Sequence, residues 1–269
     1  MASESDVLSA LAAYREHIGG NNHRVMSALI PQIESVDMDE PDIFESPEEE
    51  EGARLGYVST LLGIPEGNTQ PPIERPSDVL EYWDVLAPQL ALDGASVHPD
   101  PVYRTAKRKA YTSAVLRGLE PIECPTGTWT FPRDFEVVMQ NVDTLEGPGW
   151  SLFREQGEHL IFWEGCKIDD KRMGKKCETG QEIMNNVGIK YDVAGGWACG
   201  YGNESVCYIM YSRLKGATDQ DWSWRYVANL GQFGIEIFDD VKAVLGWYQG
   251  LVEPTESDFE ITAEEVFAP

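Results

Sequence analysis

The spacing of apolar residues changes near residue 120, and the two halves of the chain predict different secondary structure. Before residue 120, apolar residues recur every three or four positions, which is typical of amphipathic helices. After it, tryptophan, glycine and β-branched residues become frequent and the apolar runs shorten, which is typical of strands joined by turns. Because helices and strands are segregated rather than alternating, the pattern predicts an α+β fold with a mainly antiparallel sheet and a packed C-terminal helix.

The first half predicts a series of helices separated by helix-breaking residues. Ser3 or Ser5 can cap a first helix, which Gly19-Gly20 ends. A second helix begins near Val25 and ends or bends at Pro31. The same periodicity continues over three further stretches: 55–62, 77–90 and 100–119.

An acidic segment interrupts this helical pattern. Residues 34–51 contain ten acids and no base. Because Pro41 and Pro47 interrupt any helix, the composition predicts a solvated, flexible loop. The segment can alternatively be an interaction site, with Ile43 and Phe44 as its apolar anchors. The charged candidates of that site are Glu48, Glu49 and Glu50.

The second half predicts one short helix followed by several strands. Pro132 precedes a helix over 133–141, whose apolar residues lie on one side. Gly195-Gly196 and the run 200–203 are typical of turns. The expected strands are 159–164, 196–200, 206–212 and 222–230.

The C-terminal part predicts one last helix and an acidic tail. Asp239 or Asp240 can cap a helix over 241–248. The tail from Val252 carries six acids and no base, which predicts a mobile segment. The expected organisation is a helical region over 1–119, an α+β domain over 120–251 and an acidic tail over 252–269.

The formal net charge of −25 limits the classes of partner. A field of this sign repels phosphate backbones and anionic lipid headgroups, so nucleic acid and membranes are poor partners. A protein with a basic surface is a better one, although the charge can also serve solubility alone. The one dense basic cluster, from Arg104 to Lys109, is expected to pair with nearby acids rather than with nucleic acid.

Three features of the sequence predict a cytoplasmic protein. No apolar run approaches the roughly 20 residues that cross a bilayer. The start of the chain lacks the basic and apolar regions of a signal peptide. The cysteine count is five, and an odd number argues against a disulfide framework.

No motif of a known catalytic or nucleotide-binding site occurs in the sequence. A Cys124 nucleophile with His98 or His159 can be imagined, but any cysteine and histidine can be paired on that logic. The other four cysteines lack the close Cys-x₂₋₄-Cys spacing that chelates zinc, although four thiolates can still converge in space. We therefore expect no enzymatic activity and no cofactor.

Seven of the eight tryptophans fall in the second half, where they predict an aromatic core. Trp222 and Trp224 alternate along an expected strand and would face the same side of it. One or two tryptophans at an exposed edge would instead serve as anchors for a partner, since aromatic residues are enriched at interfaces. Trp222 is the candidate for that role.

Two segments of the second half carry a family resemblance. One is the run Pro132-Arg-Asp-Phe-Glu-Val-Val-Met-Gln-Asn141, and the other leads from Trp224-Arg-Tyr-Val into a closing strand and helix over 235–248. This order resembles the SUKH superfamily, which includes fungal regulators of cell-wall synthesis and bacterial immunity proteins that neutralise toxins. The resemblance covers residues 120–250 and implies an α+β fold that binds proteins and has no active site. It assigns only structural positions: Pro132, Trp224 and Phe238.

The charge, the absent motifs and the resemblance together predict a non-enzymatic regulatory protein that binds a basic partner. One alternative is a small-molecule-binding protein or an enzyme of unfamiliar type, which a deep pocket with converging polar groups would favour and a filled sheet would disfavour. Another alternative is an immunity protein that neutralises a basic toxin.

Overall fold

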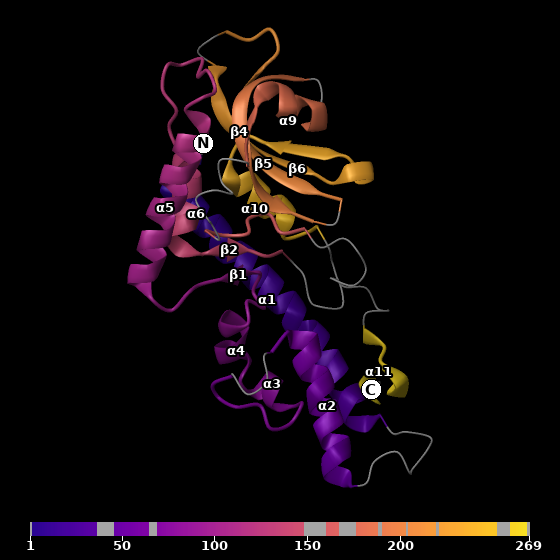
Figure 1. The fold of residues 1–269 in the computed structure, drawn as a ribbon. Coiled ribbons are helices and arrows are strands. Elements are labelled where there is room, and N and C mark those ends of the chain that lie inside the picture. The colour runs from indigo at the N-terminus through magenta and orange to yellow at the C-terminus, as the bar shows by residue number, and fades with distance from the viewer. Residues whose placement is uncertain are drawn as a thin grey trace.

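The molecule consists of a sheet with its helices at one end and a helical bundle at the other, joined by one long helix (Figure 1). Helices come first, then a five-stranded antiparallel sheet, then a closing helix, so the expected α+β class is confirmed. The computed structural model describes residues 2–36, 46–64, 69–147, 160–166, 176–187, 190–202, 204–218, 221–251 and 259–267. Within these ranges, every helix is too short or too polar to span a bilayer.

The long helix is α1 (Glu4–Ser35), and it begins where the Ser3 hydroxyl accepts the backbone N–H of Asp6. The sequence pattern predicted two helices here, and that prediction is wrong because α1 continues through Gly19-Gly20 and Pro31. Each half of α1 is buried in a different core, and this packing outweighs the weak helix propensity of glycine. Pro31 lies in the last turns, where a missing N–H removes only one helical hydrogen bond.

The second half of α1 forms a helical lobe, by which we mean the described residues of 24–92 together with 259–267. The lobe contains α2 (Pro47–Leu62), α3 (Asp78–Glu81), α4 (Trp83–Gln89) and α11 (Ala263–Phe267). Its core is mainly aliphatic, and Trp83 is the one aromatic ring among the buried members described. The largest contributors to that core are Met26, Leu29, Ile30, Ile33, Leu61 and Trp83.

The loop predicted over 34–51 is wrong at both ends. Glu34 lies in the last turn of α1, and Glu48, Glu49 and Glu50 form the first turn of α2. Ser46 caps α2 by accepting the Glu49 N–H, and Pro47 fits the first turn because its missing N–H has no helical partner there. Acidic side chains also stabilise a helix N-terminus. Residues 37–45, including Phe44, lie outside the described residues.

The C-terminal tail was expected to be mobile, but its described part, 259–267, is packed against the helical lobe. Val266 is buried, and Phe259, Ile261 and Phe267 pack against the same core. The Gln32 side chain holds this segment by donating to the Phe259 carbonyl and accepting the Ile261 N–H. The apolar residues interspersed among the acids therefore dock this segment onto the core of the helical lobe.

The five-stranded sheet has the order β3-β4-β5-β6-β7, with every neighbouring pair antiparallel. Its strands are β3 (Cys177–Thr179), β4 (Tyr191–Tyr201), β5 (Val206–Leu214), β6 (Ser223–Asn229) and β7 (Ile235–Phe238). The strands expected at 206–212 and 222–230 are confirmed. A two-stranded ladder pairs β1 (Ala95–Ser96) with β2 (Thr144–Leu145).

Two local predictions about the sheet are wrong. Gly195-Gly196 lies inside β4 rather than in a turn. The described part of the expected strand 159–164, residues 160–164, forms an isolated bridge between Trp163 and Leu145 rather than a strand. The glycines of β4 are there because neighbouring backbone approaches closely. A Cβ on Gly196 would overlap the Ile209 carbonyl, and one on Gly200 would overlap the 161–162 backbone.

Both faces of the sheet are covered. One face packs against the first half of α1, α5 (Pro101–Leu119), α6 (Arg133–Asn141) and α10 (Val241–Tyr248). The other packs against α9 (Gly180–Val187), whose Ile183 contacts Met210 and Val227. We call this assembly the sheet lobe, meaning the described residues of 2–23 and 93–251. The cores do not divide at residue 119, because α5 and half of α1 belong to the sheet lobe.

The helix boundaries of the sheet lobe follow local signals. Pro132 immediately precedes α6, and Asp240 caps α10 by accepting the Ala243 N–H. Trp224 is buried in the core, and the half-buried Phe238 packs on Trp247, with ring centroids 5.2 Å apart. The three positions singled out by the family resemblance therefore have structural roles, while the family assignment itself stays a prediction.

Candidate functional site

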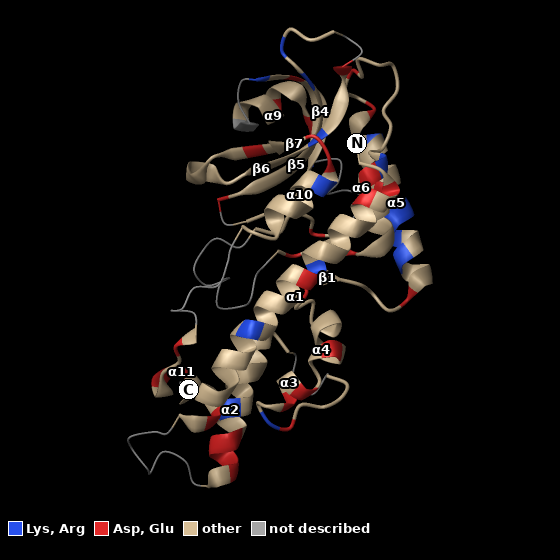
Figure 2. Cartoon of the chain, turned by 180° about the vertical axis from the view of Figure 1, so that it is seen from behind, with Lys and Arg blue, Asp and Glu red and all other residues tan. Residues whose placement is uncertain are grey.

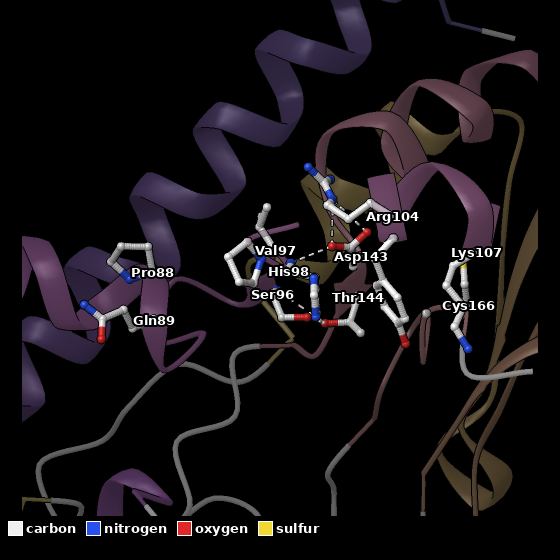
Figure 3. A pocket seen from close by; sticks show the side chains of 13 residues that line it. Pro88, Gln89, Ser96, Val97, His98, Arg104, Lys107, Asp143, Thr144 and Cys166 are labelled. Carbon is white, nitrogen blue, oxygen red and sulfur yellow. Dashed lines mark hydrogen bonds and ion pairs between the residues drawn. The ribbon is translucent and has the colours of Figure 1, made fainter. Parts of the chain in front are cut away.

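A pocket of about 760 Å³ lies where the sheet lobe meets the helical lobe (Figure 3). Its walls come from the end of α4, the segment from Ser96 to Pro99, the first turns of α5, the start of β2 and the segment at Gly165. This volume lies in the range of small-molecule sites, which run from about 300 to 1,000 Å³. The lining is predominantly apolar, with a few polar groups.

Asp143 organises one wall of this pocket. Its carboxylate accepts the backbone N–H of His98 at 2.7 Å and the Nε–H of Arg104 at 3.0 Å. Figure 3 shows Arg104 and Asp143 pointing toward each other. The backbone N–H of Asp143 also donates to the Ser96 carbonyl at 2.8 Å. Asp143 therefore fixes the β1–α5 connection against β2, and its charge is balanced by Arg104.

His98 is held in a defined tautomer. Its Nδ1 accepts the backbone N–H of Asp100 at 3.1 Å, so the neutral ring carries its proton on Nε2. The ring packs on Tyr103, with centroids 4.4 Å apart. Within the described part of the chain, Nε2 has no hydrogen-bond partner, so its N–H remains a donor for a ligand.

Lys107 supplies the other charge of the pocket. Its amino group lies 5.3 Å from the centroid of the Tyr103 ring, within cation–π range. Figure 3 places Lys107 beside Cys166, on the wall opposite Pro88 and Gln89. Among the described residues Lys107 makes no ion pair, unlike Arg104. The lining therefore carries two cations against one carboxylate, a formal charge of +1 in a chain of −25.

Thiol chemistry is suppressed at the cysteines that line or adjoin the cores. Burial raises the pKa of Cys166, at the pocket, to about 12, and it does the same for Cys177. Burial raises the pKa of Cys199 and Cys207 as well. Thiolates, not thiols, act as nucleophiles and metal ligands. The described residues contain no cluster that could hold a metal ion.

The nucleophile–base pair that the sequence allowed is not assembled among the described residues. Cys124 contacts the Thr126 hydroxyl at 3.4 Å, while His98 lines the pocket without Cys124. His159 lies outside the described residues. The cysteine that lines the same pocket as His98 is Cys166, which sequence spacing did not indicate.

Asp134 is a buried carboxylate that sequence reasoning missed, and its role is structural. It accepts the Tyr226 hydroxyl at 2.8 Å and the backbone N–H of Val241 at 3.2 Å, joining α6, β6 and the start of α10. Burial and the Asp134 charge raise the pKa of Tyr226 well above its usual value, so this hydroxyl stays protonated. Its position directly after Pro132-Arg133 gave only a weak hint, since acids are common in first helical turns.

Trp222 and Trp224 lie on the same side of the sheet, as expected from their spacing. Both contact Tyr211, with centroids 5.8 Å and 5.0 Å away respectively. Trp224 is 3% exposed, whereas Trp222 is half-buried and lies under the guanidinium of Arg213, 5.1 Å from its ring centroid. Trp222 is thus the more accessible of the two, and its role as an anchor stays a prediction.

The candidate acidic residues lie in the first turn of α2, at the end of the helical lobe that points away from β1 and α5 (Figure 2). Glu50 pairs with Arg54 at 2.5 Å, and Glu51 with the same guanidinium at 3.5 Å. The described helical lobe holds twelve Asp and Glu against three Arg, a formal charge of −9. All three arginines are engaged within the lobe, because Arg75 pairs with Asp78 and Arg24 lies over the Phe259 ring.

The basic cluster of α5 lies in the sheet lobe and accounts for most of the blue segments of that helix in Figure 2. Arg104 pairs with Asp143, so an intramolecular pairing of this cluster with an acid is confirmed for Arg104. Arg108 instead donates to the carbonyls of Met139 and Gln140, at the end of α6.

Comparisons with protein-family models, curated proteins and solved structures found no match for the chain.

Proposed function

We propose that the protein is a non-enzymatic binding protein of the cytosol that docks onto a basic protein through its helical lobe. The observation that carries this proposal is the charge of −9 on the described lobe, where each of the three arginines is already engaged by the lobe itself. The described part of the lobe therefore keeps a formal excess of nine negative charges. A basic partner neutralises this excess and is steered toward the lobe by its field.

The chemistry of the described residues supports binding rather than catalysis. The buried thiols have raised pKa values, and the buried carboxylate Asp134 is fully used by Tyr226 and backbone N–H groups. All five cysteines are described and unpaired, which suits a reducing compartment. The resemblance to the SUKH superfamily points the same way, toward either a regulator or an immunity protein.

The test begins with partners recovered from native lysate and continues with the purified pair. Titration of the recovered partner against the wild type and against the triple variant Glu48→Gln, Glu49→Gln, Glu50→Gln measures the contribution of the lobe. Glutamine retains the helix propensity of these positions. We expect binding to weaken at least fivefold in the variant and to weaken further as salt rises from about 50 to 500 mM, since screening shortens the range of the field.

A matched control removes three exposed acids from the sheet lobe: Glu120→Gln, Glu123→Gln and Glu236→Gln. This variant has the same net charge as the first, so an effect of total charge alone would appear in both. Equal weakening by the two variants, or affinity independent of salt, would contradict the proposal. The identity of the partner, a toxin or a component of a regulatory pathway, then distinguishes the immunity protein from the regulator.

A further inference from the structure

We propose that the pocket between the lobes binds a small organic ligand with a flat apolar body and one anionic group, a carboxylate or a phosphate. This site is separate from the acidic surface of the helical lobe and does not depend on the function proposed for it. The inference rests on the volume and apolar lining of the pocket, on Lys107, the lining cation that makes no ion pair among the described residues, and on the exposed side chains of Tyr103 and Val97.

The anion is placed by Lys107. Of the two lining cations, Arg104 already pairs with Asp143 at 2.8 Å, whereas Lys107 has no ion pair among the described residues. An amino group beside an apolar cavity is only partly hydrated, so an incoming anion gains a charge-assisted hydrogen bond at a modest desolvation cost. Asp143, the carboxylate in the described wall, does not repel the anion strongly, because Arg104 neutralises the Asp143 charge.

The apolar body is placed by Tyr103 and Val97. Tyr103 is 45% exposed and Val97 is 37% exposed, although both are large apolar side chains that line the pocket. Exposed apolar surface in a concave site favours a ligand that removes it from water. The Tyr103 ring packs on His98, with centroids 4.4 Å apart, and the Lys107 amino group lies 5.3 Å from its centroid, so this apolar surface is held beside the cation that receives the anion.

The orientation of the ligand is set by His98. Because Nδ1 accepts the Asp100 N–H, the Nε2–H is a directional donor with no partner in the described chain. A ligand with an acceptor near its apolar body receives this hydrogen bond while its anion contacts Lys107. The donor, His98, and the cation, Lys107, both lie in the short stretch 98–107. The Asp143 carboxylate holds this stretch in place by accepting hydrogen bonds from the His98 N–H and from Arg104.

The probes for the test share one flat body and differ in their charge. They are 2-naphthoate, 2-naphthyl phosphate, the neutral 2-naphthamide and inorganic phosphate, each titrated against the full chain by calorimetry and by backbone amide NMR. We expect both naphthyl anions to bind at least fivefold more tightly than the amide and than inorganic phosphate. We also expect amide shifts at residues 96–107 and 143–144. The ratio of the two naphthyl anions shows whether the natural group is a carboxylate or a phosphate.

Two variants of α5 separate the pocket from the general field of the helix. Lys107→Gln is expected to weaken naphthyl anion binding about tenfold, the value of one charge-assisted hydrogen bond. Lys109→Gln removes the same charge from an exposed position on the same helix, outside this pocket, and is expected to change affinity less than twofold. Circular dichroism establishes that both variants fold.

Four results would overturn the inference. The first three are no saturable binding of either naphthyl anion at millimolar concentration, equal binding of the amide, and equal loss of affinity in the Lys107 and Lys109 variants. Binding of inorganic phosphate as tight as that of 2-naphthyl phosphate would also overturn it, because the apolar body would then contribute nothing. None of these results bears on the basic-partner proposal, which the acidic variants of α2 test.

Discussion

The cores of the two lobes are built from different kinds of side chain. The core of the sheet lobe is rich in aromatic rings that contact one another. The ring centroids of Phe135 and Trp163 lie 5.3 Å apart, as do those of Trp197 and Trp224. The core of the helical lobe is aliphatic, and its segments come from positions as far apart as Val25 and Val266. The sheet lobe also has hydrogen-bonded strands, whereas the described helical lobe has helices alone.

The difference indicates that stability and recognition are divided between the lobes. Aromatic side chains bury more surface each than aliphatic ones, so the sheet lobe has the larger apolar stabilisation. The helical lobe combines a smaller core with a large excess of carboxylates, whose mutual repulsion opposes the compact state. We therefore expect the helical lobe to open first. Across the junction, Asn22 of the sheet lobe donates to the Leu92 carbonyl of the helical lobe, and the Arg15–Asp93 pair lies directly beside it within the sheet lobe.

The largest effect is expected from Phe135→Ala in the sheet lobe. The side chain is fully buried and contacts the rings of Phe131, Trp163 and Tyr226. Its truncation removes apolar burial and leaves a cavity, which costs about 3–5 kcal/mol. Urea unfolding followed by circular dichroism measures the loss. A cost below about 1 kcal/mol would show that the ring cluster is not the main source of stability.

The next effect tests the close backbone packing of the sheet. Gly196→Ala places a methyl group against the Ile209 carbonyl and is expected to destabilise by about 1–3 kcal/mol. Gly246→Ala in α10 is the matched control, because its Cβ meets nothing within 4 Å and alanine favours a helix. Thermal unfolding of the two variants should therefore shift in opposite directions. A neutral Gly196→Ala would mean that β4 and β5 can separate without cost.

A third prediction concerns the helical lobe alone. Val266→Ser puts a hydroxyl at a buried position of α11 and is expected to cost about 2 kcal/mol. Hydrogen exchange should accelerate in α2 and in the second half of α1 while β4 keeps its protection, because the two cores are separate. Glu264→Gln on the exposed side of the same helix is the control. Equal acceleration in β4 would show that the lobes unfold as one unit.

The smallest effect is a pH dependence located at Asp78. Burial raises the pKa of Asp78. This effect is outweighed by hydrogen bonds from the backbone N–H groups of Glu74 and Arg75 and by the Arg75 guanidinium, so the pKa lies below its ordinary value. A lowered folded pKa means that the ionised carboxylate stabilises the protein above about pH 4, the unfolded pKa, and that this stability is lost as pH falls through the folded value.

We therefore expect Asp78→Asn to cost about 1 kcal/mol at pH 7, comparable to the loss of a helix cap. The difference in free energy of unfolding between wild type and variant should shrink steadily below pH 4. Denaturant titrations at pH 7, 5, 4 and 3 measure it. A difference that stays constant across this range would exclude a role for the Asp78 charge.

The candidate site was only partly predictable. No pattern in the sequence indicated the lining of the described pocket, to which α5, His98 and Asp143 contribute. His98 and Asp143 are 45 residues apart, and no local pattern signals that the Asp143 carboxylate accepts the His98 N–H. The basic cluster of α5 was visible in the sequence, and its pairing through Arg104 with an acid was expected correctly.

The sequence by itself determined the α+β class, the helices that start at Asp100 and Pro132, and the closing helix capped by Asp240. These features depend on caps and periodicity, which act within a few residues. Tertiary structure decided that α1 continues through Gly19-Gly20, that Gly196 lies inside a strand, and that residues 259–267 return to cover α1 and α2. The physical reason is that burial against distant segments contributes more free energy than local propensity, and the order of residues along the chain does not reveal which distant segments will meet.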